Sequence, residues 1–190
     1  MLKIIVVRPG ATDYVDQGRI QGDLDVPLNE HGKDEVARLT KELAHRDISA
    51  IYCSMCQSAQ ATATAIADAL DVKLKPLRGM QNVNQGLWQG MCIDEVKRRQ
   101  PTIYRQFQEQ PESVRPPQGE TLGEATERVD RILEKLLKRH REGVIALVIP
   151  EPLGSLVKAR LCQGKVGDLW QASACHGDWQ LLEISPEKVS

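Results

Sequence analysis

Short apolar runs alternate along the chain with longer segments in which apolar residues recur every three or four positions. The runs at 2–7, 49–53 and 144–149 are typical of buried strands, and 72–77 and 179–184 predict two further strands. The periodic segments predict helices at 29–44, 57–70, 93–99, 102–108, 122–137 and 153–161. Strands alternating with helices predict a three-layer α/β/α sandwich with a mostly parallel central sheet.

The domain organisation follows from length and from one irregular segment. With 190 residues, the chain is long enough for one hydrophobic core, so we expect a single domain over 1–190. Residues 78–120 are rich in Gln, Gly and Pro and show the least regular apolar spacing. We expect this segment to be a lid-like insertion within the domain.

Composition excludes some partners and indicates a compartment. Lys and Arg number 25 against 26 Asp and Glu, a net charge of −1, which gives no support for binding to nucleic acid or to acidic membranes. No stretch approaches the ~20 apolar residues of a membrane span. The chain has five cysteines and no apparent secretion signal, so we expect reduced thiols in the cytoplasm.

Candidate chemistry begins where the first strand ends, at Arg8. The turn after a buried strand is where an α/β protein places a site. Five spaced motifs then follow in order over residues 2–161. They are Val-Arg-Pro-Gly-Ala-Thr at 7–12, Gly-Asp-Leu-Asp-Val-Pro-Leu at 22–28 followed by Gly32, Ile-Tyr-Cys-Ser through Thr-Ala at 51–63, Gly-Leu-Trp-Gln-Gly at 86–90, and Gly-Glu-Thr at 119–121 before Arg128.

Together these motifs resemble the histidine phosphatase superfamily, whose members have the phosphoglycerate mutase-like fold. The resemblance implies that fold and an ancestry of phosphatases and phosphomutases acting on small phosphate esters. It also implies a phosphohistidine formed on the first strand, two arginines and a second histidine around the phosphoryl group, and a carboxyl proton donor.

Only the first arginine of that catalytic set, Arg8, is matched in this sequence. The other positions are occupied by residues of different chemistry: Pro9 replaces the nucleophilic histidine, Ser58 the second arginine, Asn82 the proton donor, and Pro150, followed by Glu151, the second histidine. Proline cannot be phosphorylated or titrate and lacks a backbone donor. We therefore expect no phosphohistidine chemistry and read the chain as a member lacking both active-site histidines.

The pocket that remains is predicted to be formed by Arg8, Gly10, Thr12, Asp13, Gln21 and Gly22. Arg8 either binds an anion or is a buried structural arginine held by backbone carbonyls or by a carboxylate, with Asp13 or Glu151 as the possible partners. A carboxylate at the rim repels phosphate. We interpret His176 as a loop histidine outside this site, and we expect Trp88 to pack beneath the pocket.

The predicted function is that of a pseudophosphatase, a binding or regulatory module for a small anionic ligand or a protein partner, with oligomerisation left open. No metal ligands or cofactor motifs are predicted. An active phosphatase or phosphomutase on small phosphate esters, with rebuilt catalytic residues, is the alternative. A thiol redox role for Cys53 and Cys56 is the third hypothesis, against the simpler interpretation that both pack structurally.

Overall fold

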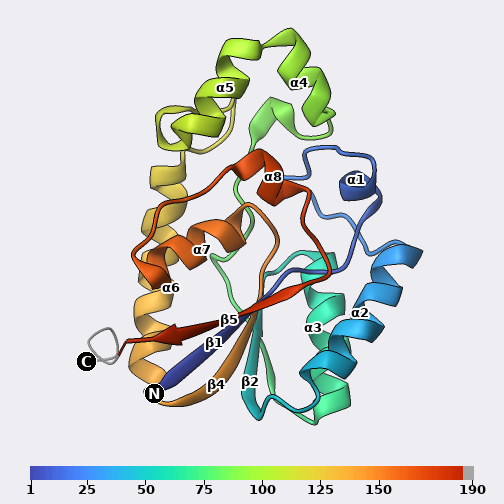
Figure 1. Cartoon of the computed structure of the whole chain (residues 1–190), viewed down its shortest axis with the longest axis vertical. Helices are drawn as coiled ribbons and strands as arrows, with labels where there is room; N and C mark the ends of the chain where they lie inside the picture. Colours follow the sequence, from blue (N-terminus) through green and yellow to red (C-terminus); the bar gives the residue numbers. More distant parts are fainter. Residues whose placement is uncertain (186–190) are drawn as a thin grey trace.

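A computed structural model describes residues 1–185 and places their strands in one five-stranded sheet (Figure 1). The strands are β1 (Leu2–Val7), β2 (Ile48–Cys53), β3 (Leu74–Pro76), β4 (Gly143–Val148) and β5 (Trp179–Ile184). Their order in the sheet is β3-β2-β4-β1-β5, with β5 antiparallel to β1 and the other neighbours parallel. The predicted α/β fold with a mostly parallel sheet is confirmed.

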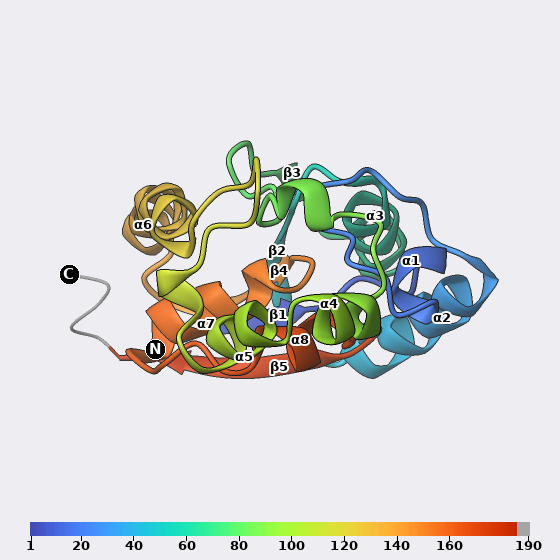
Figure 2. The same ribbon diagram turned by 90° about the horizontal axis from the view of Figure 1, so that it is seen from above.

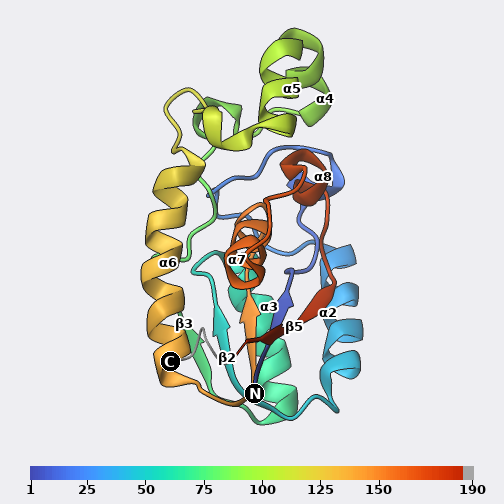
Figure 3. The same ribbon diagram turned by 60° about the vertical axis from the view of Figure 1, so that its left-hand side comes forward.

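The two faces of the sheet carry separate hydrophobic cores because successive side chains of a strand point to opposite sides. Ile4 and Val6 of β1 belong to the core beneath α6 (Leu122–Arg139) and α7 (Leu153–Cys162). Ile5 and Val7 belong to the other core, beneath α2 (Glu30–Leu43) and α3 (Gln57–Leu70). Figure 3 shows α6 on one side of the sheet and α2 and α3 on the other.

Residues 78–120 form short helices at the end of the molecule opposite the N-terminus (Figures 1 and 3). They are η1 (Gly86–Trp88), α4 (Ile93–Arg99), α5 (Pro101–Glu109) and η2 (Pro111–Ser113). Trp88 packs against Phe107 and Trp170, with ring centroids 5.6 and 5.7 Å away. These aromatic contacts therefore join residues 78–120 to α8 at this end of the molecule. Trp88 does not line the cavity described below.

Two short helices were not predicted from the sequence, because each is little more than one turn long. They are α1 (Asp13–Asp16) and α8 (Leu169–Ser173), whose first backbone N–H groups are capped by the side chains of Thr12 and Asp168. The predicted strand at 72–77 is shorter, covering only β3. The helix α6 ends at Arg139, two residues beyond the predicted end, and β4 begins at Gly143.

The predicted helices at 93–99 and 102–108 are confirmed as α4 and α5. Within residues 1–185, no helix has both the length and the apolar character needed to cross a membrane.

Candidate functional site

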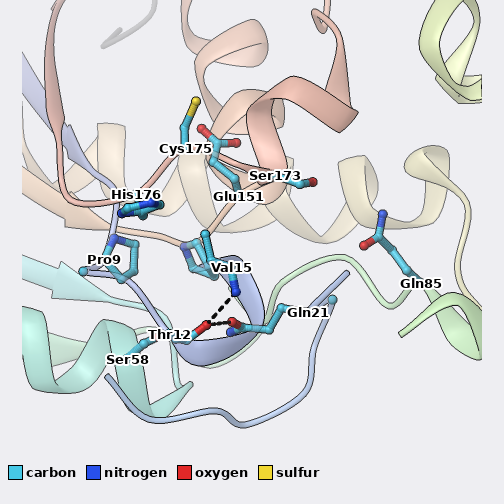
Figure 4. Close-up of a pocket in the computed structure, with 13 residues that line it drawn as sticks. Pro9, Thr12, Val15, Gln21, Ser58, Gln85, Glu151, Ser173, Cys175 and His176 are labelled. Carbon is cyan, nitrogen blue, oxygen red and sulfur yellow. Dashed lines mark hydrogen bonds between the residues drawn. The ribbon is translucent and has the colours of Figure 1, made fainter. Parts of the chain in front are cut away.

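A small cavity lies beyond the carboxyl ends of β1 and β4, where the sequence predicts a site (Figure 4). Its volume is about 30 Å³, which holds very few water molecules and is far below the roughly 300–1,000 Å³ of ordinary ligand pockets. Its lining combines the turn after β1, the loop after α1, the start of α3, the turn after β4 and the segment after α8. The lining residues are Pro9, Gly10, Thr12, Val15, Gln21, Gly22, Ser58, Gln85, Pro150, Glu151, Ser173, Cys175 and His176.

The turn after β1 is fixed by close backbone packing. A Cβ at Gly10 would overlap the carbonyl oxygen of Gly32 at the start of α2, so the tight approach requires glycine there. The Gly10 N–H donates to Thr62 Oγ1 at 3.2 Å, and Pro9 O accepts from the Gly177 N–H at 2.8 Å. The turn is thereby held between α2, α3 and the segment that precedes β5.

Arg8 points into a pair of carboxylates rather than into open space. Its Nε donates to Glu151 Oε1 at 2.7 Å, and its Nη1 donates to Asp178 Oδ2 at 2.5 Å. The Glu151 side chain is only 1% exposed, and its Oε2 accepts the Ser155 N–H at 2.8 Å. Lys158 lies 3.7 Å from the same carboxylate. Two of the three guanidinium nitrogens are therefore held by carboxylates of the protein, and Arg8, although predicted as a pocket residue, does not line the cavity.

Two opposing effects set the pKa of Arg8. Burial lowers the pKa of the guanidinium, but the hydrogen bond and charge of Glu151, together with the charge of Asp178, outweigh it and leave the pKa raised. Of the two partners predicted for Arg8, Glu151 is present. Asp13 is exposed at the start of α1 and makes no such contact, and Asp178 takes the second position.

His176 lies in a loop, as predicted, but that loop brings it to the cavity wall beside Pro9 (Figure 4). Its Nδ1 is 2.8 and 2.9 Å from the Glu35 carboxylate oxygens, and its Nε2 is 3.9 Å from Asp16 Oδ1. Glu35 also accepts the Ala11 N–H at 2.9 Å. The contact between His176 and Glu35 was not predicted from the sequence. No residue near His176 indicates that α2 and the loop before β5 meet over the turn that follows β1.

A second histidine, His31, completes this group. Its ring packs edge-on to His176 at 5.4 Å, and its Nδ1 lies 3.3 Å from Asp16. Hydrogen bonding from Asn29, together with His31, holds the pKa of Asp16 below its usual value. Across residues 1–185, no group of three or more His, Cys, Asp or Glu side chains is arranged to hold a metal ion.

Asn82 occupies a structural position next to the cavity. Its Nδ2 donates to the carbonyl oxygens of Gly22 and Glu151, both at 2.8 Å, and its Oδ1 accepts the Leu153 N–H at 3.2 Å. It therefore joins the loop before α2 to the start of α7. These three hydrogen bonds of its side chain are all to backbone atoms, and Asn82 does not line the cavity.

The remaining polar lining is uncharged. Thr12 Oγ1 donates to Gln21 Oε1 at 2.7 Å and accepts the Val15 N–H at 3.3 Å (Figure 4). Ser58 is buried at the start of α3, with its hydroxyl 3.7 Å from the Cys56 sulfur. Gln85 is 1% exposed, and its Nε2 has no hydrogen-bond partner within the described part of the chain. A buried water would satisfy that donor.

Cys53 and Cys56 lie at the end of β2 and immediately before α3. Burial raises the pKa of the Cys53 thiol to about 11, with a smaller contribution from Cys56. A thiol with so high a pKa forms little thiolate at neutral pH, which is the species that attacks disulfides and binds metals. The geometry favours the structural role for Cys53.

The comparisons with known proteins agree with the geometry of the sheet and its motifs. The model of the Histidine phosphatase superfamily (branch 1) matches residues 4–190. The chain belongs to this superfamily.

Three relatives match this chain over most of its length. Phosphoserine phosphatase 1 of Hydrogenobacter thermophilus is 32% identical over 148 residues, covering 78% of this chain and 70% of that protein. Phosphoglycerate mutase-like protein 4 of Arabidopsis thaliana is 32% identical over 150 residues, covering 77% and 65%. An uncharacterized protein of Mycobacterium bovis is 29% identical over 165 residues, covering 85% of this chain and 45% of that one. The chain thus spans only part of these relatives.

Two solved structures share the fold over nearly the whole chain. Bacillus stearothermophilus YhfR superimposes with a TM-score of 0.84 at 22% identity, covering 97% of this chain and 92% of that one. The alpha-ribazole phosphatase from Shigella flexneri gives a TM-score of 0.80 at 20% identity, covering 96% and 91%. At these identities the likeness shows the fold alone.

Proposed function

We propose that this member of the histidine phosphatase superfamily is a pseudophosphatase that performs no phosphohistidine chemistry and acts as a binding or regulatory module. The observation that best supports this proposal is the pairing of the Arg8 guanidinium with the carboxylates of Glu151 and Asp178. A phosphate dianion that accepted hydrogen bonds from the Nε or Nη1 of Arg8 would have to displace one of them. It would also approach Glu151, which is nearly inaccessible to solvent and repels it.

The absence of a nucleophile at both strand ends supports the same proposal. Pro9 and Pro150 line the cavity from the ends of β1 and β4, and neither ring can carry a phosphoryl group. Removing a single preorganised donor from an anionic transition state typically costs a factor of ~10²–10³ in rate. Ser58, at the position implied for the second arginine, offers only a neutral hydroxyl. The losses act on the same step, so little phosphoryl transfer is expected to remain.

Size limits what the module binds in this conformation. The cavity of about 30 Å³ does not admit a phosphate ester without movement of its walls. A small anionic ligand bound through the Nε or Nη1 of Arg8 also requires that guanidinium to leave Glu151 or Asp178. A protein partner that binds the outside of the fold requires no such change. We therefore favour a protein partner over a small phosphate ester.

An active phosphatase with rebuilt chemistry is the second candidate, and His176 is the observation that favours it. A histidine whose Nδ1 is held 2.8 Å from the Glu35 carboxylate stands at the cavity wall, an arrangement that orients imidazoles in many active sites. One relative is named a phosphoserine phosphatase. Against this candidate, the Nε2 of His176 faces Asp16, 3.9 Å away.

Hydrolysis of phosphoserine and of p-nitrophenyl phosphate tests the proposal. Wild type, Arg8→Ala and His176→Asn are purified in parallel, with Arg160→Ala as a control that removes an exposed ion pair with Asp130. We expect the same background rate from all four proteins. A wild-type rate that falls in Arg8→Ala or His176→Asn but not in Arg160→Ala would show that the cavity is catalytic and would overturn the proposal.

A further inference from the structure

The two edges of the sheet differ in how well they are protected against pairing with another strand. The β3 edge is three residues long and carries Lys75 and Pro76, features that discourage strand addition. The β5 edge is six residues long, contains no proline, and reads Trp-Gln-Leu-Leu-Glu-Ile. Figure 1 shows β5 crossing in front of the other strands with no helix drawn over it, and Figure 2 shows it along the outer margin.

The register identifies which backbone groups of β5 point outward. The Arg8 N–H donates to Asp178 O at 2.8 Å, and the antiparallel pairing continues with Val6 opposite Gln180. Residues alternate between facing the partner strand and facing away. Val7 O is directed to β4, where it accepts the Ile149 N–H at 2.9 Å. The backbone groups of Trp179, which lies opposite Val7, therefore point away from the sheet.

By the same alternation, the backbone groups of Leu181 and Glu183 also point outward. No helix, loop or side chain among residues 1–185 forms a hydrogen bond with the outward backbone groups of Trp179, Leu181 or Glu183. A row of unpaired N–H and C=O groups is a template for another strand.

We propose that the β5 edge is an interface with a second copy of this chain, paired antiparallel about a two-fold axis at Leu181. A two-fold contact requires that the same surface be complementary to itself. With Leu181 on the axis, it faces Leu181 of the partner subunit, and Trp179 faces Glu183 of the partner subunit. Each such pair exchanges two backbone hydrogen bonds. The interface extends the sheet across both subunits.

Charge complementarity favours a second copy over an unrelated peptide. The Arg46 guanidinium lies 4.6 Å above the Trp179 ring and forms no ion pair within the described residues. Glu183 contacts Lys3 at 3.3 Å through Oε1, and its side chain remains 60% exposed. Glu42 also contacts Trp179, but its carboxylate already accepts hydrogen bonds from the indole and from an arginine.

The pairing places Glu183 of the partner subunit directly across from Trp179 and hence beside Arg46. The two-fold axis repeats this contact at the other end of the strand pair. The same chain thus supplies both Arg46, which has no ion-pair partner among the described residues, and Glu183, the carboxylate that would contact it in the dimer. The inference is independent of the catalytic state of the cavity.

The test measures the molar mass of the full chain by sedimentation over a roughly hundredfold range of concentration, because a dimer dissociates on dilution. We expect a concentration-dependent dimer. Arg46→Glu should weaken it by about tenfold or more, because it sets two carboxylates against each other. Adding Glu183→Lys to Arg46→Glu should restore the dimer. Lys97→Glu is the matched control, since Lys97 also lies over an aromatic ring, that of Tyr104, on another surface.

Amide hydrogen exchange provides a second readout that does not depend on any variant. On concentration, the amides of Trp179, Leu181 and Glu183 should gain protection. Gln180 and Leu182 should not change, because they already face β1. A monomer at every concentration would overturn the inference. So would a dimer that Arg46→Glu leaves unchanged, or one whose formation does not protect the outward amides.

Discussion

Replacing Glu151 by Gln tests whether the buried ion pair with Arg8 is what closes the cavity. The substitution keeps the size of the side chain and an oxygen that can accept the Ser155 N–H. It removes the charge that lies 2.7 Å from Arg8 Nε. Arg8 then keeps Asp178 as its one carboxylate partner.

The magnitude follows from burial. Breaking a buried ion pair by removing one partner costs about 3–5 kcal/mol when the remaining charge is left uncompensated. Here the Arg8 side chain is 18% exposed and Asp178 remains bound, so the loss should be smaller. We expect about 2–3 kcal/mol less free energy of unfolding. For a chain of this length, that corresponds to a fall in Tm of about 5–10 °C.

Urea unfolding of wild type and Glu151→Gln, followed by circular dichroism, measures the loss. The control is Asp130→Asn, which breaks an Arg–carboxylate pair of similar distances with Arg160, 2.7 and 2.9 Å, at the surface. Its side chains are 41% and 50% exposed, so it should cost under about 1 kcal/mol. If Glu151→Gln loses no more stability than Asp130→Asn, the Arg8–Glu151 pair does not act as a stabilising buried ion pair.

Two further predictions concern the thiol and the loop beside the cavity. With its pKa raised to about 11, Cys53 should be alkylated by iodoacetamide at pH 8 at least about 100-fold more slowly than the exposed Cys175, as followed by peptide mass spectrometry; equal rates would contradict burial. Gly177→Ala should cost about 2 kcal/mol or more, because φ is +57° and the new Cβ would overlap the Glu35 carboxylate. In Gly164→Ala the new Cβ would meet no neighbouring atom, so the free energy of unfolding should change by less than about 0.5 kcal/mol. Equal losses in the two variants would contradict the strain and crowding expected at position 177.

Much of the fold could be predicted because its signals are local. The apolar run of β1 and the alanine periodicity of α3 are readable within their own segments, and α3 has the predicted bounds. The helices α1 and α8 could not be recognised, since one turn carries too little periodicity. Their capping side chains, Thr12 and Asp168, were the available signals.

The candidate site was only partly predictable, for a different reason. Glu151 could be predicted from the sequence, because it lies in the turn three residues after the buried strand β4 ends at Val148. His176 reaches the cavity and Asp178 reaches Arg8 only because β5 pairs antiparallel with β1, and that pairing cannot be read from the residues around them. The contact between Glu35 and His176 likewise joins segments far apart in sequence.

Phosphate binding at the cavity is the most direct test of the proposed pseudophosphatase, and amide NMR of the labelled chain measures it. Inorganic phosphate is titrated while the amides of Gly10 and Thr12, at the turn after β1, are followed. We predict no saturable shift of these signals, because Arg8 stays bound to Glu151 and Asp178. Saturable shifts that disappear in Arg8→Ala would contradict it.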